Sequence, residues 1–140
     1  MEILDLTEEY LEKTEALDRR VFPHSPWGAQ SFRGNIVNDF DHPVIAVEDG
    51  EVLGYGILRL IDVGEILLIG VRPEDRRKGI GKALVKAMLE RANPDENVFL
   101  EVRESNMAAR RLYLSMGFMQ TARRRNYYKD PVEDAVIMMV

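Results

Sequence analysis

Apolar residues along this 140-residue chain follow two different periods, and each period predicts a different kind of element. Apolar positions that alternate with polar ones, or form short runs between turn residues, indicate β-strands. Apolar positions that recur every three or four residues indicate helices that bury one face. The expected strands are Ile3 to Leu6, Val44 to Val47, Val52 to Ile61, Glu65 to Val71, Val98 to Val102, a segment from Phe118 onward, and Ala135 to Val140, which closes the sheet. The expected helices run from Glu8 to Arg19, from Ser25 to a point before Asp39, from Lys82 to Arg91 with Ile80 already at the apolar spacing of that helix, and from Asn106 to Met116.

Turn and capping residues support several of these boundaries. Thr7 directly precedes the first helix and can cap it. Ser25-Pro26 pairs a capping residue with proline at the first helical position. Asp49-Gly50 favours a type I′ turn, which predicts a β-hairpin. Gly117 is the expected C-terminal stop of the last helix.

The order of the elements defines the expected fold class. It is one strand, two helices, three strands, a helix, a strand, a helix and two strands. This order predicts an α/β domain in which helices cover a mixed sheet. With 46% hydrophobic and 31% charged residues the chain has the composition of a globular protein, and its length fits one domain of residues 1–140.

Charge and residue usage exclude several function classes. The net charge of −5 argues against a general nucleic-acid binder and suits a cationic substrate. The absence of cysteine excludes disulfides, thiolate nucleophiles and cysteine metal sites. His24 and His42 lie beside prolines in loop-like segments, so no metal site is expected. The first residues lack the features of a signal peptide and no window approaches the roughly 18 apolar residues of a membrane span, so we expect a cytoplasmic protein without membrane contact.

A basic turn, Arg76-Arg77-Lys78-Gly79-Ile80-Gly81, separates an expected strand from the helix that continues at Lys82. Amides at a helix N-terminus lack internal partners and carry partial positive charge, so such a turn can hold a polyanion. Its glycines can let a ligand approach the backbone closely and can adopt unusual dihedral angles. The pattern fits neither the dinucleotide fingerprint nor the P-loop, and a tight turn with a solvated basic edge is the simpler alternative.

Glu101 lies within the apolar segment Val98 to Val102, where strand alternation places it on the opposite face from Val98, Leu100 and Val102. One interpretation is a charge at the rim of the fold or a partner for Arg103. The other is a general base whose pKa burial raises toward neutrality.

Aromatic residues near the C-terminus are open to two interpretations as well. Tyr113 lies seven residues after Asn106 on one side of the same helix, and it can either pack in the core or donate a proton to a leaving thiolate. Asn106 can cap the helix and contact a ligand at once. Tyr127 and Tyr128 either pack across strands or form a wall around an extended peptide, and Trp27 has the same ambiguity.

Taken together, these segments resemble the GNAT superfamily of N-acetyltransferases, and within it the RimI-type N-terminal acetyltransferases. The segments that carry the resemblance are Ser25-Pro26-Trp27, the basic turn, Leu100 to Asn106, Leu112-Tyr113 with Gly117-Phe118, Arg124 to Tyr128, and Glu133 to Met138. The resemblance covers nearly the whole chain. It implies the GNAT fold, with a mixed sheet of about seven strands flanked by about four helices, and with parallel strands 4 and 5 splayed apart around acetyl-CoA.

The resemblance also implies a reaction. An acetyl group would pass directly from acetyl-CoA, leaving coenzyme A, to the N-terminal amine of a protein, and the known target of the most similar group is the N-terminal alanine of a small-subunit ribosomal protein, the eighteenth. The implied cofactor contacts are Ile69, Gly70 and Val71 to the pantetheine arm, Arg76 to Lys82 around the pyrophosphate, and Asn106 and Tyr113 beside the arm. The implied catalytic residues are Glu101 as general base and Tyr113 as general acid, and the implied substrate contacts are Trp27, Tyr127 and Tyr128.

Two other functions are compatible with the same residues. One is a GNAT enzyme that acetylates a small amine, and the other is a catalytically silent acyl-CoA-binding module. The sequence favours no particular oligomeric state and no direct nucleic-acid partner.

Overall fold

The computed structural model describes residues 1–140 and contains one seven-stranded sheet and four α-helices. The elements follow the expected order, which confirms the α/β class. None of the helices is long and apolar enough to span a membrane. The elements are β1 (Glu2–Asp5), α1 (Glu8–Val21), α2 (Ala29–Val37), β2 (Asp41–Glu48), β3 (Glu51–Ile61), β4 (Val63–Val71), the 3₁₀ helix η1 (Pro73–Asp75), α3 (Ile80–Arg91), β5 (Val98–Arg103), α4 (Met107–Ser115), β6 (Met119–Tyr128) and β7 (Glu133–Met139).

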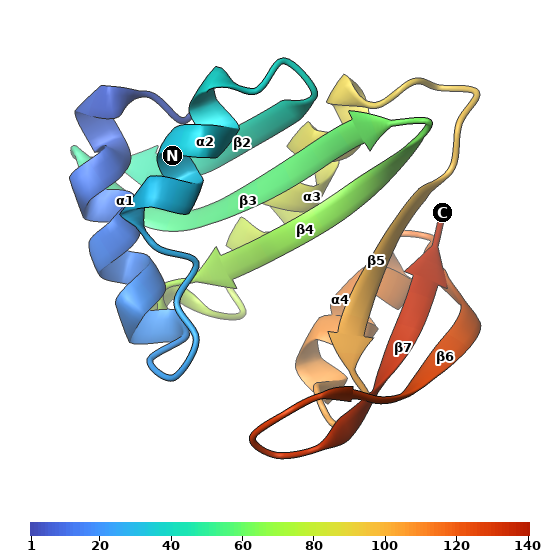
Figure 1. Ribbon diagram of the computed structural model, residues 1–140. Coiled ribbons are helices and arrows are strands. Elements are labelled where there is room, and N and C mark those ends of the chain that lie inside the picture. The colour runs from blue at the N-terminus through green and yellow to red at the C-terminus, as the bar shows by residue number, and fades with distance from the viewer.

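The strands lie in the order β1-β2-β3-β4-β5-β7-β6, and only β4 and β5 are parallel neighbours (Figure 1). We expected the last strand to close the sheet, but β7 lies between β5 and β6, and β6 forms the edge. The reason is hydrophobicity. Ala135, Val136 and Met138 of β7 are buried, whereas every residue of β6 before Tyr128 is exposed. The more apolar strand therefore takes the interior position.

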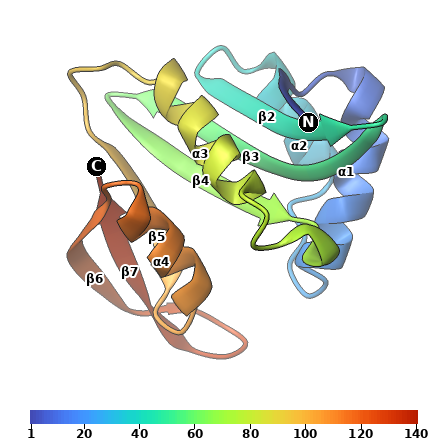
Figure 2. The ribbon, with the colours of Figure 1, turned by 180° about the vertical axis from the view of Figure 1, so that it is seen from behind.

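Two hydrophobic cores form on opposite faces of the sheet (Figures 1 and 2). Helices α3 and α4 cover one face, where Leu84 and Tyr113 pack with residues from both halves of the sheet. Helices α1 and α2 cover β2 and β3 on the other face, where Leu17 and Phe32 are buried. No helix covers β5, β7 and β6 on this second face, so that half of the sheet is open there (Figure 1).

The predicted hairpin between β2 and β3 is confirmed. Asp49 and Gly50 have φ values of 51° and 76°, and a type I′ turn requires a positive φ at both central residues.

Helix α2 begins at Ala29, so the expected start at Ser25 is wrong. The cause is a contact with the preceding helix, α1. The carboxylate of Asp18 accepts hydrogen bonds from the backbone amides of Trp27, at 2.6 Å, and Gly28, at 3.2 Å. These bonds accompany a non-helical backbone, with Gly28 at a φ of 93° as the N-cap residue. Trp27 therefore lies in the connection between α1 and α2.

The other helix ends agree more closely with the sequence. Asn106 is the N-cap of α4, and its Oδ1 accepts a hydrogen bond from the Ala109 amide at 3.2 Å, as its capping role predicts. Gly117 follows α4 with a φ of 95°. Thr7 precedes α1 as expected, but its side chain makes no capping hydrogen bond.

The parallel strands β4 and β5 pair over only three residue pairs, from Gly64–Val98 to Ile66–Leu100. Directly beyond this point β4 contains a bulge, because Leu67 is left without a partner on β3. A bulge bends a strand and increases its twist. As a result β4 continues along β3 while β5 continues along β7, and the two strands diverge (Figure 1). This confirms the predicted splay of strands 4 and 5.

Gly70 of β4 provides a test of this packing. A Cβ added at Gly70 would lie 2.6 Å from the Cζ and Oη atoms of Tyr55, whose side chain is only 1% exposed and cannot move aside. We expect Gly70→Ala to lower the free energy of unfolding by about 1–3 kcal/mol through overpacking, as measured by chemical denaturation.

Gly34 of α2 supplies the control, because a Cβ added there meets nothing within 4 Å. Alanine loses less conformational entropy than glycine in a helix, so Gly34→Ala should raise the free energy of unfolding by about 0.5–1 kcal/mol. Equal stability of the two variants would contradict the packing described here.

Candidate active site

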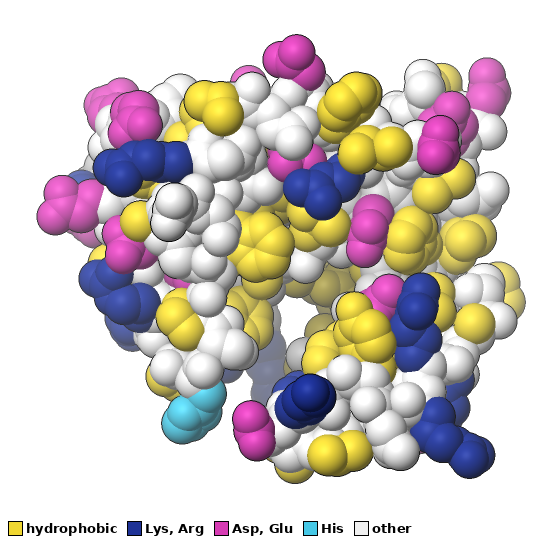
Figure 3. All heavy atoms as spheres, viewed as in Figure 1, with side chains coloured by type: hydrophobic (Ala, Val, Ile, Leu, Met, Phe, Trp, Pro, Cys, Tyr) yellow, Lys and Arg dark blue, Asp and Glu magenta, His cyan; other side chains and the backbone are white.

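The ends of β4 and β5 diverge (Figure 1), and the space-filling view shows a hollow between them (Figure 3). Its first side consists of β4, the basic turn that follows it, and the connection between α1 and α2. Its second side consists of β5 and the hairpin of β6 and β7. Figure 3 shows apolar side chains around the hollow and basic side chains below it. The predicted site residues all come from these segments or from α4 behind β5.

The backbone of the basic turn is shaped to accept an anion. Arg77 and Gly79 have φ values of 65° and 86°, and Gly79 is the N-cap of α3. The amide of Ala83 bonds the carbonyl of Gly79 at 3.0 Å and begins the helical ladder. The amides of residues 80–82 therefore precede the ladder, which leaves them free to donate to a ligand.

The basic side chains of the turn differ in their partners. Asp75 forms ion pairs with Arg72 and Lys78. Hydrogen bonds from Arg72 and then Lys78 hold the pKa of the Asp75 carboxyl below its ordinary value. The positive charge of Lys78 is thus partly neutralised. Arg76, Arg77 and Lys82 form no ion pair within the chain, but Arg76 donates through Nε to the Val71 carbonyl. Arg77 and Lys82 are therefore the two cations of this segment without such a bond, and they are free to meet an anion.

The exposed edge of β4 lies beside the same turn. Residues 69–71 pair with β3 on one side, while on the other side β5 has already diverged. Peptide groups on that side have no strand partner and can bond an extended ligand. Arg76 Nε donates to the carbonyl of Val71 at 3.3 Å, which ties the turn back to the end of the strand.

Two residues of the turn have structural roles; the helical spacing of Ile80 indicates its role, and sequence reasoning did not assign the role of Gly81. A Cβ on Gly81 would lie 3.1 Å from Leu112 of α4, so Gly81 allows α3 and α4 to approach each other. Ile80 is 5% exposed and belongs to the core, so only its backbone amide can face a ligand. Gly79 keeps its expected role, because it combines a positive φ with open space around it.

Glu101 projects from β5 on the opposite face from the buried residues Val98, Leu100 and Val102, as the alternation predicts. Its side chain is 13% exposed, and its Oε1 lies 3.3 Å from Nε of Arg124 on β6. Its other oxygen, Oε2, is buried and has no hydrogen-bond partner. An unpaired buried carboxylate oxygen is costly, which is a reason to expect that it serves a ligand.

Arg103 is not the partner of Glu101, so that alternative for Glu101 is wrong. Arg103 instead forms an ion pair with Glu133 at 3.2 Å and donates to the carbonyls of Pro131 and Lys129, at 3.0 and 2.9 Å. These bonds fix the turn between β6 and β7, which lies at the bottom of the ribbon in Figure 1.

Tyr127 and Tyr128 contact each other edge to face, with ring centroids 5.1 Å apart and an interplanar angle of 85°. Burial and then the charge of Glu101 raise the pKa of Tyr128 to about 12. The neighbouring Glu101 carboxylate is the main cause that raises the pKa of Tyr127. Both hydroxyls therefore stay protonated at neutral pH beside the carboxylate. The structure brings these two tyrosines together with Glu101.

Tyr113 is 4% exposed and packs against Phe118, with ring centroids 5.6 Å apart. Burial, and then the nearby Tyr128, raise the pKa of its hydroxyl. The core-packing interpretation is thus correct for the ring, and the hydroxyl is a group that keeps its proton.

Trp27 belongs to the connection between α1 and α2, on the first side of the hollow, whereas Tyr127 and Tyr128 lie at the end of β6, on the second side. It packs against the apolar cluster that also contacts Leu67 and Leu68 of β4. Its Nε1 donates to Oδ1 of Asn35 at 2.7 Å. The three predicted substrate residues are therefore divided between two walls.

Glu65 is a site residue that the sequence interpretation missed. It lies on β4, opposite Arg59 of β3, and burial followed by the charge of Glu101 raises its pKa, while Arg59 and Arg124 act in the opposite direction. The signal was available, because Glu65, like Glu101, is a carboxylate in an apolar strand. No local signal identifies Arg124, since its role depends on the pairing of β6 with β7. No group of three or more His, Asp or Glu side chains is arranged to hold a metal ion.

The fold matches that of a solved N-acetyltransferase. The crystal structure of the ribosomal-protein-S18-alanine N-acetyltransferase from Escherichia coli aligns with 99% of this chain and 92% of that chain, with a TM-score of 0.87 and 29% identity. A plant structure, Arabidopsis thaliana NAA60 in complex with a bisubstrate analogue, shares the fold with a TM-score of 0.84, over 99% of this chain and 95% of that chain, at 21% identity.

Residues 3–118 match the family described as the Acetyltransferase (GNAT) family, and the chain belongs to that family. GNAT acetyltransferases use acetyl-CoA as the acetyl donor. The Bacillus subtilis protein named "Putative [ribosomal protein bS18]-alanine N-acetyltransferase" is 36% identical over 120 residues, which are 83% of this chain and 80% of that protein. The [Ribosomal protein bS18]-alanine N-acetyltransferase of Escherichia coli K12 is 33% identical over 81% of this chain and 79% of that protein.

Glu65 generates a prediction about stability. Its pKa in the folded protein is raised above the ordinary value of 4.5, so the folded state favours the protonated form. Ionisation of Glu65 therefore lowers the free energy of unfolding as the pH rises above that value. Glu65→Gln removes this cost. We expect the variant to have a higher Tm than the parent at about pH 7, and a Tm difference that shrinks toward about pH 4.

The control is Glu12→Gln, which replaces an exposed carboxylate of α1. It should leave the Tm almost unchanged at both pH values. A Glu65→Gln variant that is less stable than the parent at neutral pH would show that the Glu65 charge is compensated in the fold.

Proposed function

We propose that this enzyme acetylates the N-terminal α-amine of proteins in the cytoplasm, by direct transfer from acetyl-CoA, and that its substrate is the N-terminal alanine of a small-subunit ribosomal protein. The observation that carries the proposal is Glu101, whose buried Oε2 lacks a partner at the point where β4 and β5 diverge. The names of the bacterial relatives support the choice of substrate.

The first side of the hollow fits the acetyl donor. The amides of residues 80–82, with Arg77 and Lys82, match the two negative charges of a pyrophosphate. The unpaired edge of residues 69–71 matches an extended pantetheine arm. The cap uses only the side-chain oxygen of Asn106, so its side-chain nitrogen Nδ2 is available to the same arm. Bound acetyl-CoA supplies the acetyl group as an activated thioester.

Glu101 accepts the proton of the attacking amine at Oε2. Arg124 on Oε1 holds the carboxylate in place and leaves the second oxygen free. A positioned base of this kind contributes about 10²–10⁴-fold to a rate. Tyr127 and Tyr128 form the wall beside it, where their hydroxyls and rings can contact the first residues of a peptide.

Tyr113 supplies a proton at its hydroxyl to the leaving thiolate. A tyrosine hydroxyl, with an ordinary pKa of about 10, keeps its proton at neutral pH until that step. The base and the acid thus come from neighbouring elements, β5 and α4, and no covalent intermediate with the enzyme is required.

The weak basicity of an α-amine favours it over lysine in this site. Its pKa is about 8, against about 10.4 for lysine, so near neutral pH roughly a tenth of the α-amine is uncharged and far less of the lysine amine is. A single carboxylate base is then sufficient. The two carboxylates Glu65 and Glu101 also favour the approach of a cationic N-terminus.

The test is acetylation of a peptide panel in the presence of acetyl-CoA. A peptide that begins with the alanine sequence of the ribosomal protein should be acetylated on its α-amine, as located by tandem mass spectrometry. The same peptide with a blocked N-terminus and an internal lysine should not react. Acetylation of polyamines or free amino acids in preference to every peptide would overturn the proposal.

Glu101→Gln in the same assay tests the base. We expect kcat/KM for the peptide to fall about 10²–10⁴-fold while the affinity for acetyl-CoA changes less than about twofold, because Gln keeps the shape but cannot take a proton. Full activity of this variant would show that the proton leaves by another route. Acetyl-CoA binding without turnover on any amine by the parent protein would instead identify a silent binding module.

A further inference from the structure

Asp18 of α1 is a fully buried carboxylate that no step of the proposed reaction uses. Its Oδ2 accepts hydrogen bonds from the amides of Trp27, at 2.6 Å, and Gly28, at 3.2 Å. Its Oδ1 accepts the hydroxyl of Tyr55 at 2.8 Å. Three donors thus converge on one side chain, and two of them belong to the wall of the hollow that carries Trp27.

Tyr55 connects this carboxylate to strand β4. The Tyr55 ring is buried against Gly70 of β4, where an added Cβ would come within 2.6 Å of it. Gly70 lies in the stretch of β4 whose outer edge faces the hollow. Burial, and then the hydrogen bond to Asp18, raise the pKa of Tyr55, so its hydroxyl remains a donor. A continuous path of contacts therefore runs from β4 through Tyr55 and Asp18 to Trp27.

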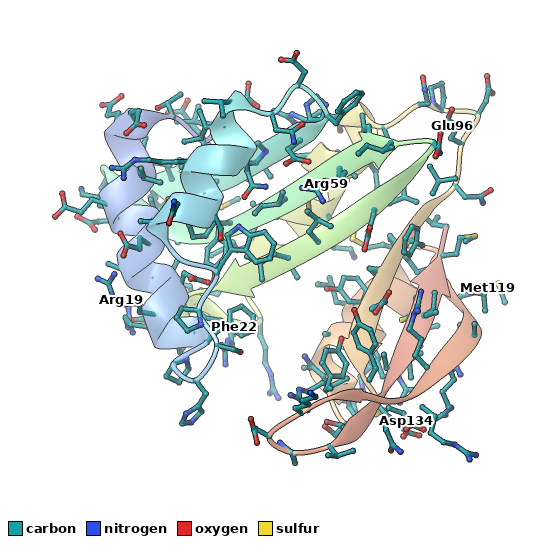
Figure 4. The ribbon with its side chains drawn as sticks, viewed as in Figure 1. Arg19, Phe22, Arg59, Glu96, Met119 and Asp134 are labelled. Atoms are coloured by element: carbon teal, nitrogen blue, oxygen red, sulfur yellow. The ribbon has the colours of Figure 1, made fainter.

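The indole of Trp27 is held by a second path. Its Nε1 donates to Asn35, whose Nδ2 donates to Asp41 at 2.9 Å. Arg59 makes two hydrogen bonds to Asp41, at 2.7 and 3.0 Å. Figure 4 shows Arg59 on β3 next to β4, and its cross-strand neighbour on β4 is Glu65. The backbone of Trp27 is thus linked through Asp18 and Tyr55 to the sheet beside Gly70 of β4, and its ring is linked through Asn35 and Asp41 to β2 and β3.

This arrangement is expensive if its only purpose is stability. A buried carboxylate loses its hydration, and well-packed apolar residues often stabilise a fold as much or more. The Asp18 carboxylate also holds the connection between α1 and α2 in a non-helical conformation. Helix α2 therefore begins at Ala29 rather than at Ser25, where the Ser25-Pro26 signal predicted its start. Figure 4 shows Phe22 at the end of α1, where this connection starts beside the hollow.

We propose that Asp18 is a positioning residue for the peptide acceptor. It holds the α1–α2 connection that carries Trp27, the Trp27 wall, at a fixed distance from β4, so that the N-terminal amine of the peptide is aligned with the acetyl group of acetyl-CoA. The inference rests on the proposed function. This positioning matters for an extended peptide acceptor, since a peptide spans the space between the Trp27 wall and the opposite wall, which carries Tyr127 and Tyr128.

The test compares Asp18→Leu, which removes the acceptor for all three donors, with Asp18→Asn, which keeps an acceptor oxygen for the amides. In Asp18→Leu we expect the KM for the alanine-start peptide to rise about tenfold while the KM for acetyl-CoA changes less than about twofold. Asp18→Asn should restore most of the peptide affinity. If Asp18→Leu does not fold, Tyr55→Phe, which removes only the link to β4, should raise the peptide KM in the same direction.

Trp27 is the only tryptophan of the chain, so its fluorescence reports on the wall directly. Quenching by acrylamide should increase in Asp18→Leu and return toward the parent value in Asp18→Asn. The control is Thr14→Val, which removes another fully buried polar group of α1, one that bonds only the Tyr10 carbonyl at 2.8 Å. It should change neither the quenching nor the peptide KM.

The outcomes separate the two proposals. If the parent enzyme acetylates peptides and Asp18→Leu raises the peptide KM no more than Thr14→Val does, the positioning role is overturned and the proposed function stands. If the parent enzyme acetylates no peptide, the proposed function itself is overturned. A rise in peptide KM together with increased quenching, both reversed in Asp18→Asn, establishes the positioning role.

Discussion

The site depends on one constraint, which is that β4 and β5 stop pairing after Ile66 and Leu100. Backbone groups beyond that point must find other partners or remain free for a ligand. The bulge at Leu67 turns β4 away, and the contact of Gly81 with Leu112 joins α3 to α4 behind the gap. The sheet is therefore continuous at one end and open at the other. The basic turn, the free strand edge and Glu101 all gain their function from this divergence.

Charges around the hollow are arranged so that Oε2 of Glu101 remains without a partner. Arg124 pairs with one oxygen of Glu101, and Arg103 is kept away from it by Glu133. The carboxylate is thus neither fully neutralised nor exposed, which is the state that a proton acceptor needs. On the opposite wall, Asp18 accepts a hydrogen bond from the backbone amide of Trp27. Hydrogen bonds, rather than helical structure, therefore fix the backbone of that wall.

The sequence was most informative where a feature is local. The turn at Asp49-Gly50, the capping Asn106 and the alternation around Glu101 follow from neighbouring residues, and the structure agrees with them. The predicted start of α2 was wrong because Asp18 of the preceding helix accepts hydrogen bonds from the amides of Trp27 and Gly28.

Other roles were invisible in the sequence for the same reason. The pairing of Arg124 with Glu101 exists only once β7 has inserted between β5 and β6, and the need for glycine at position 81 exists only once α3 meets α4. Family resemblance supplied the cofactor and the catalytic roles, which composition and periodicity alone left open.

Hydrogen exchange with and without acetyl-CoA tests most directly whether the divergence of β4 and β5 creates the donor site. If it does, the amides of residues 67–71 and 77–82 exchange more slowly when the donor is bound, while those at the far edge of the sheet in β1 are unchanged. Slower exchange confined to segments outside β4, the basic turn and β5 would contradict the site described here, whatever the activity of the enzyme.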